Sequence, residues 1–286
     1  IGLFFFIPVA FENEKLKKIF PSVLIILCIV FAYLTTERLQ VWKSSVALWT
    51  DTIEKNPNSN EAYNNRGDYY NTAGILDKAF EDFTNSARVN PKQPNAFNNL
   101  AVIWFKRNEL DKALIENQRA LDLDPEYTQA MSNRGILYYN KNQLDSAKFY
   151  YEKAIELLPT YSFAICNLGS VYLKQEKPDS AIMYYKKALE LLPNYHDASK
   201  YMGLAYLRKD DFVEAEKYMY AAKKMSSNSD ALQVLSSEYV VRASKAFHNN
   251  ETDKAISFCE KAIQINPQNA EAYYNMGGYY MTRQNI

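Results

Sequence analysis

The stretch DSAKFYYEKAIELLP, residues 145–159, has the pattern of an amphipathic helix that ends at a proline. Small and apolar side chains follow the spacing i, i+3, i+4, i+7 and i+8: Ala147, Tyr150, Tyr151, Ala154 and Ile155. This spacing puts them on one face of a helix. The closing proline cannot continue a helix, so the segment predicts a helix with one buried face and a defined end.

The same pattern recurs along the chain with a period of 34 residues. Five prolines have this spacing: Pro57, Pro91, Pro125, Pro159 and Pro193. A fixed period of roughly 20–50 residues indicates a solenoid, in which each unit buries its apolar face against its neighbours. We number each unit from residues 60, 94, 128, 162 and 196, so that the proline takes position 32 in the first four units.

Residue types also recur within the units. Position 8 is small and position 24 is usually large; the residues at position 8 are Gly67, Ala101, Gly135, Gly169 and Gly203, and those at position 24 are Phe83, Asn117, Tyr151, Tyr185 and Met219. We expect the small residues to let two helices approach closely and the large ones to fill the space between helix pairs.

This pattern resembles the tetratricopeptide repeat over residues 45–286. The resemblance implies an all-α solenoid of antiparallel helix pairs in a right-handed superhelix with a concave groove. We expect a half-repeat at the junction 37–59, then an array over 60–286. It has five regular repeats to 227, a lengthened one over 228–267 with a longer first helix, and a truncated one over 268–286. Because the array stops within a repeat, we expect Ile286 not to be a natural terminus.

Residues 19–36 carry no charge. As a helix they are about 27 Å long, close to the roughly 30 Å of a bilayer's hydrocarbon core. They predict a transmembrane helix in contact with a lipid bilayer. A signal peptide is the alternative, but no small-residue cleavage site follows the run. The apolar residues 1–11 read as the end of a preceding span, so Ile1 is not expected to be a natural terminus.

The sequence predicts no catalytic, cofactor-binding or metal-binding residue in this stretch, and no cofactor. The three cysteines, at 28, 166 and 259, lie far apart, and no phosphate-binding or zinc motif is present. Basic and acidic residues balance at 33 each, which argues against a nucleic-acid partner. We therefore expect a binding protein rather than an enzyme within these residues.

The junction after the apolar run has a second resemblance. Arg38, Trp42, Trp49 and the Asn-Pro-Asn at 56–58 follow the run in a pattern similar to multi-pass, glycosyltransferase-like membrane proteins of the transmembrane O-mannosyltransferase type. That resemblance implies an upstream catalytic part and a repeat array in the periplasm or lumen. Basic residues on either side of the run, Lys15, Lys17 and Lys18 against Arg38 and Lys43, favour the same orientation. The alternative is a stand-alone membrane-anchored adaptor that organises an envelope complex.

Position 6 of the first helix supplies the candidate site for a protein or extended peptide. An asparagine recurs there, at Asn65, Asn99, Asn133, Asn167 and, in the last repeat, Asn275. Its amide can pair with both the C=O and the N–H of a bound peptide backbone. The alternative is that each asparagine pairs with a neighbouring helix. Residues in the same helices give no cluster of Lys and Arg for a carboxylate: Asn64, Asp68, Asn98, Ser132 and Cys166.

Overall fold

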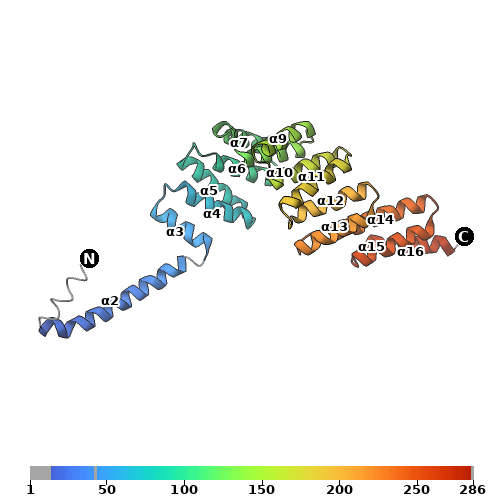
Figure 1. Cartoon of the computed structure of the whole chain (residues 1–286). Coiled ribbons are helices and arrows are strands. Elements are labelled where there is room, and N and C mark those ends of the chain that lie inside the picture. The colour runs from blue at the N-terminus through green and yellow to red at the C-terminus, as the bar shows by residue number, and fades with distance from the viewer. Residues whose placement is uncertain (1–13, 42–43, 285–286) are drawn as a thin grey trace. The chain divides into compact units, whose positions relative to one another are not determined.

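A computed structural model describes residues 14–41 and 44–284, and in this part of the chain every regular element is an α-helix (Figure 1). The predicted end of a preceding span at 1–11, and Trp42 and Lys43 of the junction, lie outside the described residues. The helices are α2 (Glu14–Val41), α3 (Ser45–Lys55), α4 (Asn60–Thr72), α5 (Leu76–Val89), α6 (Pro94–Lys106), α7 (Leu110–Leu123), α8 (Thr128–Asn140), α9 (Leu144–Leu157), α10 (Ser162–Lys174), α11 (Pro178–Leu191), α12 (His196–Arg208), α13 (Phe212–Met225), α14 (Ala231–His248), α15 (Thr252–Ile265) and α16 (Ala270–Gln284).

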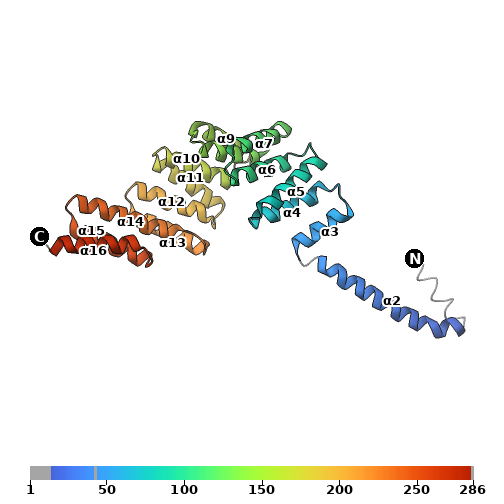
Figure 2. The ribbon, with the colours of Figure 1, turned by 180° about the vertical axis from the view of Figure 1, so that it is seen from behind.

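The helices group into two compact units, α2–α7 and α8–α16. Within each unit, successive helices pack in pairs, and the views from both sides show each pair beside the next (Figures 1 and 2). The first helices of neighbouring pairs also contact one another: α4 with α6 in the first unit, and α8 with α10 and α10 with α12 in the second. The first helices therefore form one layer of each unit.

The turn inside each pair has the same backbone in all six complete repeats. The second residue after the first helix adopts a positive φ of 58–75°: Gly74, Asn108, Asn142, Glu176, Asp210 and Asn250. In the second repeat the Asn108 N–H donates to Phe105 O at 2.9 Å and the Glu109 N–H donates to Trp104 O at 2.9 Å. These two bonds form a Schellman motif, which satisfies the last carbonyls of the helix and reverses the chain.

The core lies between the two helices of a pair and follows the predicted positions 8 and 24. The side chains at position 24 are all buried, and their size matches the residue at position 8. Phe83, Tyr151, Tyr185 and Met219 face a glycine. In contrast, the smaller Asn117 and Cys259 occur in repeats where position 8 is Ala101 and Ala243, the latter counted back from Pro267.

The sixth repeat departs from the regular geometry at its first helix. Helix α14 has 18 residues, whereas α4, α6, α8, α10 and α12 have 13 each. Counting back from Pro267 puts position 1 at Ser236, so the extra residues lie at the N-terminal end of α14. The second helix, α15, keeps the 14 residues of its counterparts.

Helix α2 contains the residues predicted to cross a membrane. It is a single helix of 28 residues with Pro21 inside it. Each described side chain between residues 19 and 36 is exposed. In the described parts of the chain, however, no helix combines the length and apolar character that a membrane crossing needs. The helix is thus present, and its role as a membrane span is not shown.

Candidate functional site: a groove on helices α8, α10 and α12

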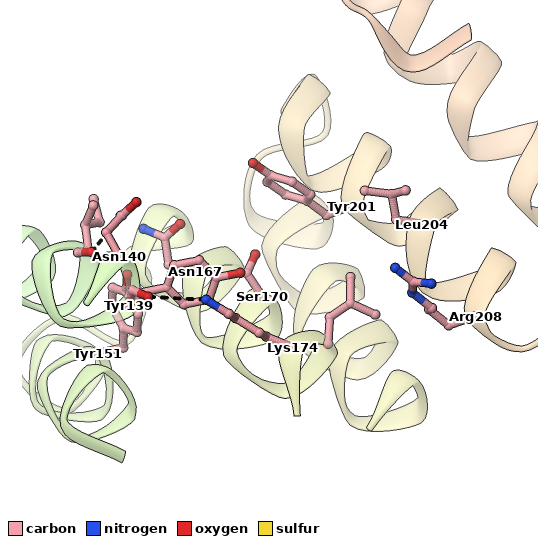
Figure 3. A pocket seen from close by; sticks show the side chains of 11 residues that line it. Tyr139, Asn140, Tyr151, Asn167, Ser170, Lys174, Tyr201, Leu204 and Arg208 are labelled. Carbon is pink, nitrogen blue, oxygen red and sulfur yellow. Dashed lines mark hydrogen bonds between the residues drawn. The ribbon is translucent and has the colours of Figure 1, made fainter. Parts of the chain in front are cut away.

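The second unit has an open groove of about 580 Å³ on its layer of first helices (Figure 3). Ten of its eleven lining residues come from α8, α10 and α12, and the other is Tyr151 of α9. The polar side chains in the groove are Tyr139, Asn140, Tyr151, Asn167, Ser170, Lys174, Tyr201 and Arg208. Ile136, Leu173 and Leu204 add an aliphatic surface.

The repeat period explains which side chains reach the groove. Asn167, Ser170 and Lys174 take positions 6, 9 and 13 of α10, a spacing of i, i+3 and i+7 that forms one stripe along a helix. Tyr201, Leu204 and Arg208 take the same three positions of α12. Positions 6, 9 and 13 therefore all face the groove in both helices.

The predicted asparagines differ in their surroundings. In the second unit Asn133, Asn167 and Asn275 are all half-buried, and of these three Asn167 lines the groove. In the first unit Asn65 is exposed. Asn99 instead pairs with the neighbouring helix.

The contacts of Asn99 match the alternative interpretation of these asparagines. Its Nδ2 donates to Asn64 Oδ1 at 3.1 Å and to Asp68 Oδ1 at 3.2 Å. Both acceptors lie on α4, one repeat earlier. This amide stabilises the stacking of α6 on α4. The surroundings of Asp68 also raise the pKa of its carboxyl group, because burial disfavours the charged form.

The charges in the groove are positive only. Lys174 and Arg208 line it, and no Asp or Glu does. Lys174 Nζ donates to the backbone carbonyl oxygen of Tyr139 at a long 3.5 Å. It also lies 4.5 Å from the centroid of the Tyr139 ring. The Arg208 side chain is exposed and makes no hydrogen bond or ion pair with another described residue, whereas most of the other described arginines do.

Tyrosine hydroxyls add hydrogen-bonding capacity. Burial raises the pKa of Tyr139 and of Tyr201, so both stay protonated and can donate a hydrogen bond at neutral pH. The Tyr185 hydroxyl donates to Ser170 Oγ at 3.1 Å, which fixes that serine at the floor of the groove. Within the described residues, no cluster of His, Cys, Asp or Glu could hold a metal ion.

Sequence reasoning missed the two cations. It considered neighbouring positions of the first helices, where Ser132 and Cys166 are uncharged, and not position 13. A basic residue in the last turn of a helix is favoured by the helix dipole and so carries little functional signal by itself. The signal that could have identified Lys174 and Arg208 is the stripe at positions 6, 9 and 13.

The comparison with family models identifies the class of protein. Models described as "Tetratricopeptide repeat" match residues 81–128, 128–161, 162–195, 239–269 and 258–285, together more than half of the chain. The chain belongs to the tetratricopeptide repeat family. Proteins with this repeat act as protein-interaction scaffolds and are typically non-catalytic. The matches do not show a relationship to glycosyltransferase-like membrane proteins.

Solved structures show the same fold. A chain in the "Crystal structure of APC/C hetero-tetramer Cut9-Hcn1" matches with a TM-score of 0.65 and 17% identity, over 81% of this chain and 45% of that chain. This chain thus spans less than half the length of that protein. PilF of Pseudomonas aeruginosa matches with a TM-score of 0.59 and 22% identity, over 77% of this chain and 97% of that one. No curated protein matches.

Proposed function

We propose that this chain is an interaction scaffold that holds an extended segment of a partner protein in the groove of α8, α10 and α12. The observation that carries the proposal is the stripe at positions 6, 9 and 13, which presents side chains from successive helices to one open groove. A ligand that runs from α10 to α12 would meet side chains from the same three positions of each helix.

The chemistry of the groove suits a peptide backbone with mixed side chains. The Asn140 and Asn167 amides and the Tyr201 hydroxyl can bond backbone N–H and C=O groups. Leu173 and Leu204 offer apolar contacts to the side chains between them. Because the groove is open rather than enclosed, an extended chain can reach it from solvent.

Photo-crosslinking tests this proposal. A photoreactive phenylalanine analogue is placed at Leu204 in the groove and, as the control, at Lys187 on α11. The whole chain in mild detergent is then irradiated with a pool of random twelve-residue peptides, and the adducts are identified by mass spectrometry. We expect adducts at 204 that are lost in the double variant Asn167→Ala/Tyr201→Ala. Equal labelling at 187 and 204 would argue against a peptide site in this groove.

We also propose that α2 anchors the scaffold in a lipid bilayer, with the repeats on the extracytoplasmic side. Large apolar side chains are exposed all round this helix, including at consecutive positions: Val23, Leu24, Ile25, Ile26, Leu27, Ile29, Val30 and Phe31. A protein partner would cover one face of a helix, whereas acyl chains surround it. Leaving so much apolar surface in water costs about 25 cal/mol for each Å².

The finer identity that we propose is the recognition arm of a larger glycosyltransferase-like membrane protein. The motif of the junction supports this proposal, together with the apolar helix before it. The alternative is an anchored adaptor without a catalytic part. The coding sequence upstream of Ile1 separates the two: several further apolar spans with an acidic residue in the first long extracytoplasmic loop favour the transferase, and a start codon within a few dozen residues favours the adaptor.

A further inference from the structure

We infer that the segment bound in this groove is acidic, with Asp or Glu side chains that pair with Lys174 and Arg208. This inference rests on the proposed peptide-binding function and specifies the chemical class of the ligand. The two cations occupy position 13 of neighbouring helices α10 and α12. Figure 3 shows both side chains in the groove.

The first argument is the unused bonding capacity of Arg208. A guanidinium has five N–H donors in a planar fork that matches a carboxylate. Four other arginines each pair with an aspartate outside their own helix: Arg66 with Asp82, Arg107 with Asp77, Arg242 with Asp210 and Arg283 with Asp253. Arg208 lacks such a partner among the described residues and extends into the groove instead, so a ligand carboxylate can take that place.

The second argument is the net charge of the three first helices that line the groove. Helices α8, α10 and α12 contain Arg134, Lys174, Lys200 and Arg208, with Asp197 as their one acidic residue. Lys200 is occupied by an ion pair with Asp230, and Arg134 is buried. The positive charge that a ligand can reach is therefore that of Lys174 and Arg208, with no carboxylate in the groove to neutralise it.

The third argument is Lys174, which is held but not neutralised. Its contacts with Tyr139 are a carbonyl oxygen at 3.5 Å and the face of the ring. Both orient the ammonium group without cancelling its charge. Neighbouring packed helices lie about 10 Å apart, so the two cations suit carboxylates two to four residues apart in an extended peptide.

A peptide array tests the inference. The whole chain in mild detergent is bound to several thousand immobilised random twelve-residue peptides, and the signal is regressed on peptide net charge. We expect bound peptides to be enriched in Asp and Glu, with the best acidic binders at least tenfold weaker in Lys174→Glu/Arg208→Glu. The matched control is Lys186→Glu/Lys187→Glu on α11, which makes the same change in net charge away from the groove and keeps the acidic preference.

The outcomes separate this inference from the proposed function. Binding without a charge preference that is lost in Asn167→Ala/Tyr201→Ala keeps the peptide groove and overturns the acidic ligand. Equal loss of acidic binders in the groove and control variants also overturns it, because only net charge would then matter. If no peptide binds the wild-type chain above the level of Asn167→Ala/Tyr201→Ala, both conclusions fall. Circular dichroism of each variant confirms that the helices are intact.

Discussion

Gly169 and Tyr185 fit together so closely that a single added carbon would collide. A Cβ at Gly169 would lie 2.8 Å from Tyr185 Cε1, and the tyrosine ring is fully buried between α10 and α11. The same relationship joins Gly135 to Tyr151, where the distance would be 2.5 Å. The size of the side chain at position 24 therefore dictates glycine at position 8.

Gly169→Ala should destabilise the chain by about 1–3 kcal/mol, because overpacking a well-filled core forces shifts of this order. Urea unfolding of the second unit measures the change. The matched control is Gly277→Ala in α16, where an added Cβ meets nothing within 4 Å. That variant should be neutral or more stable by about 0.5–1 kcal/mol, since alanine favours a helix over glycine. Equal effects of the two variants would contradict the packing argument.

Glu176 is expected to be a point of strain. Its φ is 58°, a conformation in which an L-residue other than Gly, Asn or Asp is unfavourable by roughly 1–2 kcal/mol. Glu176→Gly should raise the free energy of unfolding by about 1 kcal/mol, which thermal or urea unfolding detects. Gln175→Gly serves as the control: this residue has a φ of −82°, so glycine there gains nothing and lowers stability. A fall in stability for Glu176→Gly would refute the prediction.

The ion pair of Arg66 with Asp82 should contribute to the stability of the first unit. Arg66 Nε and Nη2 each donate to an Asp82 oxygen at 2.8 Å, and the carboxylate is almost completely buried. Asp82→Ala leaves a partly buried guanidinium without its carboxylate and should cost about 3 kcal/mol. Glu156→Ala, which breaks an exposed pair with Lys153, should cost less than about 1 kcal/mol. Chemical denaturation of both variants provides the measurement, and similar losses would be inconsistent with this view.

The cysteines provide a built-in test of the α2 anchor. Cys166 and Cys259 are buried, and burial raises the pKa of their thiols to about 12 and about 11, so both are protonated and protected at neutral pH. Cys28 on α2 is exposed. We expect a membrane-impermeant maleimide to label the folded chain once in detergent, and all three thiols to react in urea.

Insertion of α2 into lipid should then hide that single reactive thiol. We expect labelling of Cys28 to fall at least tenfold after the chain is reconstituted into phosphatidylcholine vesicles. Vesicles dissolved in detergent before labelling are the control and should restore the reaction. Unchanged labelling of reconstituted protein would count against a bilayer around α2.

Much of the fold could be predicted from the sequence because one period fixes it. The helices α4, α6, α8, α10 and α12 begin at residues 60, 94, 128, 162 and 196, where the repeat numbering starts. Periodicity also brings Asn167 to the groove. It could not distinguish Asn167 from Asn99, because the partners of Asn99 are set by Asn64 and Asp68 on the preceding helix. The right-handed sense of the superhelix stays a prediction.

The stripe at positions 6, 9 and 13 does not overlap with the core positions 8 and 24. Asn167 and Lys174 can therefore change without touching the fit of Gly169 to Tyr185, whereas Ser170 accepts a hydrogen bond from the Tyr185 hydroxyl. Ligand preference and folding are thus encoded largely by different residues of the same helix. A chain built in this way can acquire a new partner by exchanging a few groove side chains, one repeat at a time, while the solenoid that presents them stays the same.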